Sequence, residues 1–174
     1  AISPKALEAY KKSKITKSYF DWGQMLDNNK NGFYPYTPAV NLLYALNEAV
    51  DMLLEEGLES VFKRHKRHAD ATRIAVEAWG LEILAKNPIE RSNSITAIMV
   101  PDGHDSDNLR KIIYDNYNMS LGTGLNKVKG KVFRIGHMGD LNDLTLAGTL
   151  SGVEMGLKQS GIPFKKGGIM AALD

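Results

Sequence analysis

An α+β fold is predicted for this 174-residue sequence by two observations. From residue 58 onward, helical and strand-like segments follow in the order α-β-α-β-β-α, which forms a small sheet covered by helices on one face. Residues 1–57 offer two helices, a long irregular stretch and no strand, so they lack the sheet that a complete domain needs. We therefore interpret residues 1–57 as the end of a larger domain and residues 58–161 as a small α+β domain. Residues 162–174 are expected to form a poorly ordered tail.

The first part of the chain contains two predicted helices. A serine N-cap followed by proline indicates a helix over residues 4–12. Residues 13–38 are expected to be irregular, because residues 27–32 read Asp-Asn-Asn-Lys-Asn-Gly, a dense turn signal, and two prolines follow. Apolar residues then repeat at helical spacing over residues 39–56, and Gly57 ends that helix.

The second part of the chain changes from helical to strand-like periodicity after Gly80. Runs of β-branched and apolar residues indicate strands, and residues with short polar side chains mark the N-caps of helices. The predicted elements are a helix over 58–79, a strand over 95–100, a helix capped by Ser106, strands over 117–121 and 132–135, and a helix over 143–159 capped by Asn142.

Composition and charge exclude several classes of function. The formal net charge of +2 is too small to indicate a nucleic acid or anionic membrane partner. No apolar run approaches the roughly 20 residues that span a bilayer. The chain has no cysteine, which excludes disulfides and thiolate metal sites and is consistent with a reducing compartment. We expect a cytoplasmic protein that binds neither nucleic acid nor membrane.

Arg134 is the first candidate binding residue. It follows two apolar residues in the predicted strand 132–135, and the fork geometry of its guanidinium suits a carboxylate held by two hydrogen bonds. The alternative interpretation is a structural ion pair, since a buried arginine is rare unless it is paired.

Tyr34 and Thr37 are the second candidates. They place two hydroxyl groups just before the helix over residues 39–56, and hydroxyls beside the free N–H groups of a helix N-terminus suit a phosphate. The alternative is that Thr37 is an ordinary N-cap and Tyr34 packs as an aromatic residue.

The histidines give a weaker signal. His65 and His68 are spaced three apart on one helix, but no third ligand completes a recognisable site, so we predict no metal centre. His137 follows the strand of Arg134 and is expected to line the same cleft. No combination of nucleophile and base indicates a catalytic residue within this chain.

Three stretches together carry a resemblance to a known family. They are Tyr-Phe-Asp-Trp-Gly at residues 19–23, Gly-Phe-Tyr-Pro-Tyr-Thr-Pro at 32–38 leading into Leu-Tyr-Ala-Leu at 43–46, and Gly-Lys-Val-Phe-Arg-Ile-Gly-His-Met-Gly-Asp-Leu-Asn at 130–142. In this order they resemble the class V, pyridoxal phosphate-dependent alanine– and serine–glyoxylate aminotransferases, and the bacterial serine–glyoxylate branch in particular. The similarity continues to about residue 161.

The resemblance implies the C-terminal portion of a fold-type I subunit, in which the small α+β domain is preceded by the end of the large α/β domain. It implies that Arg134 pairs with the α-carboxylate of the substrate. It also implies that Tyr34 and Thr37 reach the phosphate of the pyridoxal 5'-phosphate bound by the neighbouring subunit of a homodimer. The lysine that binds the cofactor covalently is expected upstream of Ala1, because no lysine here matches its motif. The chain alone is therefore expected to be inactive.

The implied reaction moves an amino group from serine, alanine or aspartate to glyoxylate or a similar 2-oxo acid. Two other hypotheses stay open. One is a non-catalytic binding or dimerisation module with the small-domain fold, which predicts that residues 1–57 fold back and cover their apolar helix faces. The other is a relative that uses the same cofactor for a lyase or desulfurase reaction.

Overall fold

The computed structural model describes residues 2–174, which divide into two units, one ending at Met52 and the other beginning at Leu53. The first unit consists of α1 (Pro4–Lys12), α2 (Trp22–Asn29) and most of α3 (Val40–Glu56). Ser3 caps α1 as predicted, its hydroxyl accepting a hydrogen bond from the N–H of Ala6 at 3.2 Å. No residue between 2 and 52 is buried. This unit therefore has no core of its own.

Helix α2 corrects the prediction of an irregular stretch over residues 13–38, which holds only outside residues 22–29. Asp21 caps α2 by accepting hydrogen bonds from two backbone N–H groups of its first turn. The hydroxyl of Tyr10, on α1, donates to the same carboxylate, and the rings of Tyr10 and Trp22 stack with centroids 5.5 Å apart. The helix contains glycine and two asparagines, which are poor helix formers, so its support from α1 is not visible in its own sequence.

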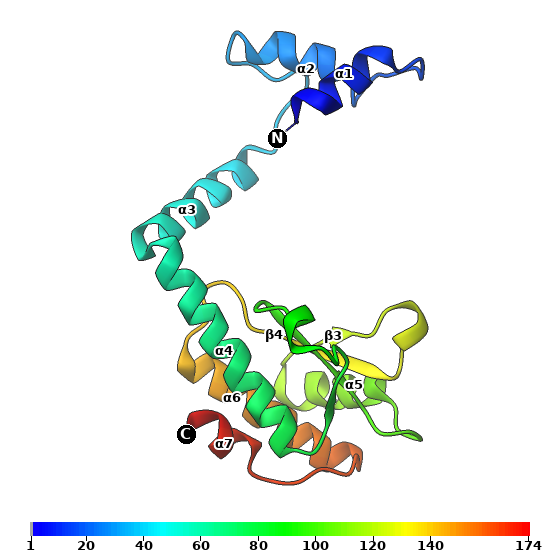
Figure 1. Ribbon diagram of the computed structural model, residues 1–174, viewed down its shortest axis with the longest axis vertical. Coiled ribbons are helices and arrows are strands. Elements are labelled where there is room, and N and C mark those ends of the chain that lie inside the picture. The colour runs from blue at the N-terminus through cyan, green and yellow to red at the C-terminus, as the bar shows by residue number, and fades with distance from the viewer. Residues whose placement is uncertain (1) are drawn as a thin grey trace. The chain divides into compact units, whose positions relative to one another are not determined.

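The second unit contains a four-stranded sheet and the helices that cover it (Figure 1). In chain order its elements are α4 (Leu58–Ala78), β1 (Glu82–Ile83), a 3-10 turn (Pro88–Glu90), β2 (Ile95–Met99), α5 (Ser106–Tyr117), β3 (Gly122–Thr123), a second 3-10 turn (Asn126–Val128), β4 (Val132–Gly136), α6 (Asp143–Ser160) and α7 (Gly168–Leu173). Helices α3, α4 and α6 lie within one residue of their predicted bounds at each end.

The strands form one antiparallel sheet in the order β1-β2-β4-β3. Ile98 pairs with Phe133 and Thr96 pairs with Ile135, so these four side chains point to the same face, and all are buried. Helix α4 packs on β1 and β2, and α5 packs on β3 and β4. The prediction of an α+β unit with helices against one face of a small sheet is confirmed.

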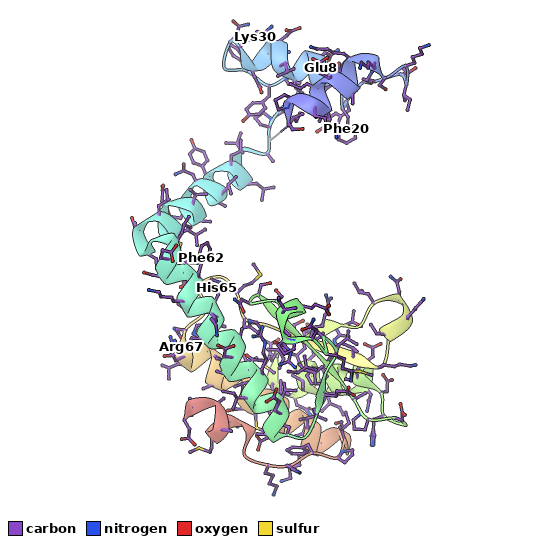
Figure 2. The ribbon with its side chains drawn as sticks, viewed as in Figure 1. Glu8, Phe20, Lys30, Phe62, His65 and Arg67 are labelled. Atoms are coloured by element: carbon purple, nitrogen blue, oxygen red, sulfur yellow. The ribbon has the colours of Figure 1, made fainter. Side chains whose placement is uncertain are left out.

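The core lies between that face of the sheet and the helices. Buried apolar residues of the helices and of the segment after α4 fill it, among them Val76, Trp79, Leu81, Leu109, Ile113, Leu150, Val153 and Leu157. Figure 2 shows side chains crowded between the sheet and the helices of this unit, whereas those of α3 radiate from the helix. The second unit therefore has the core that the first lacks.

Helix α5 differs from its prediction at both ends. Asp105, not Ser106, is its N-cap, and the Ser106 hydroxyl instead donates to the carbonyl of Val132 at 3.0 Å. The helix runs through Tyr117 and ends at Asn118 in the left-handed region, with φ of 51°. The predicted strand over 117–121 is therefore wrong, and only the two residues of β3 pair with β4. The two-residue β1 was not predicted, because so short a strand has no periodicity.

The prediction of a poorly ordered tail after Gly161 is wrong. Helix α7 packs against α4 and α6 (Figure 1). Glu154 of α6 accepts a hydrogen bond from the indole N–H of Trp79 at 2.8 Å and another from the N–H of Gly167 at 3.2 Å. Gly168 is buried, and a Cβ on it would lie 2.3 Å from the indole nitrogen, so this glycine allows close packing. No helix within residues 2–174 is long and apolar enough to cross a membrane.

Candidate functional site

Arg134 lies in β4 on the face of the sheet opposite the core. Its partner on β2 is Ala97 and its partner on β3 is Gly122, and paired residues of neighbouring strands point to the same side. Arg134 and Ala97 are partly buried, in contrast to the buried residues on the helix-covered face. The small neighbours leave room for the arginine to extend across the sheet, where its guanidinium can meet a ligand.

The guanidinium of Arg134 has no carboxylate partner among residues 2–174. It forms none of the ion pairs of this part of the chain, and its Nε is buried without a hydrogen-bond partner. The structural ion pair considered as an alternative is therefore not formed within these residues. A buried donor without a partner is costly, and the absence of a carboxylate partner leaves the positive charge of the guanidinium uncompensated within these residues.

His137 does not line a cleft with Arg134, contrary to expectation. Its side chain is fully buried. Its Nδ1 lies 3.1 Å from the carbonyl of Asn93 and its Nε2 lies 2.9 Å from the hydroxyl of Thr96. A carbonyl only accepts, so Nδ1 carries a hydrogen, and in the neutral imidazole Nε2 accepts from the hydroxyl of Thr96. Burial lowers the pKa of His137 below its ordinary value.

The segment that follows β4 is fixed to α4 by hydrogen bonds to its backbone. Arg64 donates to the carbonyls of Gly139 at 2.7 Å and Leu141 at 3.2 Å. The N–H of Gly139 donates to Nε2 of His65 at 3.0 Å, and Nδ1 of His65 donates to a carbonyl of its own helix. Arg64 is itself held by a two-pronged ion pair with Glu56, and this hydrogen-bonded partner lowers the pKa of Glu56. The end of the arginine-bearing strand is thus held in place.

His68 has a structural role on the same helix. Its Nε2 lies 3.1 Å from Asp143, at the start of α6, and Arg67 pairs with the same carboxylate at 2.8 Å. His65 and Arg67 both stand on α4 in Figure 2. Hydrogen bonds from Arg67 and then His68 lower the pKa of Asp143. Within residues 2–174, no three histidine, aspartate or glutamate side chains come together as metal ligands.

Tyr34 and Thr37 line one pocket of about 420 Å³ in the first unit. Both residues are exposed. Thr37 is not the residue that starts α3: the carbonyl of Ala39 accepts the first helical hydrogen bond, from Leu43 at 3.1 Å. The alternative role of Thr37 as an ordinary N-cap is therefore not observed. Two hydroxyl groups free to turn toward one pocket are a donor set that suits a phosphate.

The structure brings two of the predicted site residues together, and the third belongs to the other unit. Tyr34 and Thr37 share a pocket, while Arg134 stands on the sheet of the second unit. The residues around Arg134 that matter for its position, Ala97 and Gly122, were missed by the sequence reasoning. Each lies on a different strand, so only the strand register shows that they flank the arginine.

Comparison with curated proteins shows close relatives over almost the whole chain. No protein-family model matches the sequence. A serine–glyoxylate aminotransferase from Arabidopsis thaliana is 52% identical over 171 residues, which cover 98% of this chain and 43% of the plant protein. A serine–glyoxylate aminotransferase from Methylorubrum extorquens is 46% identical over 176 residues, covering 98% of this chain and 44% of that protein. The chain thus spans less than half the length of these relatives.

Solved structures agree with the sequence comparison. Pyridoxamine–pyruvate aminotransferase from Mesorhizobium loti superposes with a TM-score of 0.86 at 31% identity, over 98% of this chain and 45% of that structure. The fold is that of the C-terminal portion of pyridoxal phosphate-dependent aminotransferases of class V, and the chain belongs to that family. Within the family it is similar to the serine–glyoxylate aminotransferases and their alanine- and aspartate-using relatives.

Proposed function

We propose that this chain is the C-terminal portion of an aminotransferase that moves an amino group from a small amino acid to glyoxylate or a similar 2-oxo acid. Serine, alanine and aspartate are the candidate donors. The observation that carries the proposal is the unpaired guanidinium of Arg134, in a chain that is 52% identical to a serine–glyoxylate aminotransferase. Residues 1–57 would be the end of the large domain and 58–161 the small domain, in a cytoplasmic homodimer.

Arg134 would hold the α-carboxylate that every donor and acceptor of this reaction shares. A bidentate pair with guanidinium fixes both the position and the orientation of a carboxylate. Orientation matters because the bond broken at the α-carbon must be aligned with the cofactor, and a well-oriented reactant reacts far faster than a loosely held one. The hydrogen bond that Arg64 donates to the carbonyl of Gly139 and the one that His65 accepts from the N–H of Gly139 would help to hold the strand of Arg134 in place.

Tyr34 and Thr37 would hold the phosphate of pyridoxal 5'-phosphate, which belongs to the neighbouring subunit. Both residues line one pocket, and their hydroxyl groups can donate hydrogen bonds to the oxygens of a phosphate. When bound, this cofactor supplies the electron sink that amino-group transfer needs. The lysine that binds it covalently would be contributed by a part of the subunit outside these 174 residues. These residues by themselves would then have no transaminase activity.

The module hypothesis has less support. It predicts that residues 1–57 cover their apolar helix faces, but no residue of α1, α2 or α3 is buried. Large apolar side chains of α3 are exposed to solvent, among them Leu42, Tyr44, Leu46 and Leu54. An uncovered apolar surface of this kind needs a partner.

The test is to isolate the natural protein that contains this sequence and to measure its subunit mass, its visible absorbance and its activity. We expect a yellow subunit more than twice this length, which loses colour with an amino donor and regains it with glyoxylate. A colourless natural protein of this length that is unchanged by added pyridoxal phosphate would contradict the proposal.

The residue assignments are tested in the same protein. Arg134→Ala should raise KM for the amino acid by roughly 100-fold, as expected for a lost charge-assisted bidentate pair, with little change in cofactor binding. The double substitution Tyr34→Phe and Thr37→Val should instead weaken retention of the cofactor during dialysis and leave KM for the amino acid little changed. If Arg134→Ala released the cofactor and left KM unchanged, the two assignments would be wrong.

A further inference from the structure

We infer that Gly122 is a positioning residue for Arg134. Its lack of a side chain lets the arginine lie across β3, and this contact fixes the edge of the guanidinium that is open to a carboxylate. The inference rests on the proposed function of Arg134 and deepens it, because it names what sets the orientation of the bound carboxylate.

The strand register gives Arg134 the two smallest residues as neighbours. Ala97 is its partner on β2 and Gly122 is its partner on β3. A Cβ placed on Gly122 would lie 3.1 Å from both Cβ and Nε of Arg134 and 3.5 Å from its Cζ. The arginine side chain therefore lies against Gly122, closer than a Cβ on that residue would ordinarily allow. Contacts of 3.1 Å are tighter than ordinary van der Waals contact, so a methyl group at position 122 would push the side chain of Arg134, Nε included, aside by a few tenths of an ångström.

The same contact selects one edge of the guanidinium. An arginine can hold a carboxylate through Nε and one terminal nitrogen, or through both terminal nitrogens. Nε of Arg134 is buried and has no hydrogen-bond partner within residues 2–174. The two terminal nitrogens, Nη1 and Nη2, are not buried without a partner in this way. With Nε closed off, the edge formed by Nη1 and Nη2 is left for the bidentate pair. The carboxylate would thus bind at the tip of the side chain.

The test compares Gly122→Ala with a matched control in the full-length, cofactor-loaded enzyme. The control is Gly148→Ala on α6, an exposed position where the new Cβ meets nothing within 4 Å. Each variant is given an amino acid donor and a primary amine of the same size without the carboxylate, and the bleaching of the bound cofactor is titrated. Gly122→Ala should weaken the response to the amino acid by roughly 10- to 100-fold, the effect of a small misplacement of a positioning group, and leave the response to the amine unchanged.

Two further variants test the position of Arg134 if Gly122→Ala does not fold. Ala97→Val crowds Arg134 from the other strand and should also weaken only the amino acid response. Ala97→Gly combined with Gly122→Ala gives the guanidinium room on β2 and should restore part of the response to the amino acid. Equal losses for amino acid and amine, or a wild-type response from both Gly122→Ala and Ala97→Val, would overturn the inference.

Failure of the inference can be told apart from failure of the proposed function. If Arg134→Ala responds to the amino acid as well as the wild-type enzyme, Arg134 is not the carboxylate residue and the inference falls with it. If Arg134→Ala loses the amino acid response while the Gly122 and Ala97 variants keep it, the function stands and only the positioning role is lost.

Discussion

At the scale of single residues, burial rather than residue type decides which side chains are available for chemistry. Arg134 and His137 are three positions apart, and both were expected in one cleft. Because successive residues of a strand point to opposite faces, Arg134 lies on the open face while His137, just beyond the strand, turns inward. The ring nitrogens of the histidine bond with Thr96 and Asn93, whereas the guanidinium of Arg134 has no carboxylate partner within residues 2–174, so the arginine is the better candidate for a ligand.

Buried, neutral His137 should make stability fall in mild acid. Burial lowers its pKa in the folded protein, so the unfolded chain binds this proton more readily. The stabilisation is present above the ordinary value of 6.5 and is lost as pH falls from there toward the folded pKa. Denaturant unfolding of the 174-residue chain at pH 7.5 and 5.5 measures this loss, which we expect to be smaller in His137→Gln.

His104→Gln provides the matched control, because it removes a histidine from a loop and should leave the pH dependence of the wild-type chain. The carboxylate of Asp143 does not interfere with this comparison. Hydrogen bonds lower the pKa of Asp143, so its contribution to stability is lost only as pH falls below about 4, the ordinary range for aspartate. Identical pH dependence in the wild-type chain and His137→Gln would show that His137 is not the titrating group.

At the scale of elements, capping residues and long-range contacts determine where the helices begin and end. Asn142 forms a capping box with Thr145, each bonding the other's backbone at 2.9 Å, and this local pattern made the start of α6 predictable. Helix α7 has no cap signal, and its position depends on Glu154 and Trp79, which are far from it in sequence. A short helix held by distant residues cannot be recognised from its own composition.

Glu154→Ala should loosen α7 from the second unit. The change removes the acceptor of the buried Trp79 indole N–H and of the N–H of Gly167, and an unpaired buried donor costs about 1–3 kcal/mol. The free energy of unfolding of the 174-residue chain should fall by that amount, and amides of α7 should exchange faster. Glu154→Gln keeps an acceptor for the indole and should lose clearly less. Equal losses in the two variants would mean that packing, not hydrogen bonding, holds α7.

At the scale of the whole molecule, the two units differ in what stabilises them. The second has a continuous buried core, and the first has no buried residue between 2 and 52. An apolar helix without a core is marginal in water, since helical stability in proteins comes mainly from packing. Large apolar residues of α3 are exposed in this chain, which spans less than half the length of the relatives it matches.

Hydrogen exchange should separate the two units. In the 174-residue chain we expect amides of α1, α2 and the first half of α3 to exchange at rates near those of unfolded peptides, while β2, β4 and α6 are protected. In the natural protein that contains this sequence, α3 should become protected. Protection of α3 in the short chain, equal to that of α6, would contradict the view that its partner surface lies outside these residues.

The sequence by itself determined the elements that local signals encode and the family. Serine and asparagine caps, helical apolar periodicity and a β-branched run predicted α1, α3, α4, β2 and α6, and three short stretches indicated an aminotransferase with Arg134 as its carboxylate residue. Only the tertiary structure decided the elements supported from a distance, namely α2 and α7. It also decided which face of the sheet Arg134 occupies and that Gly122 lies beneath it. Strand register joins residues far apart in the chain, and no local pattern encodes it.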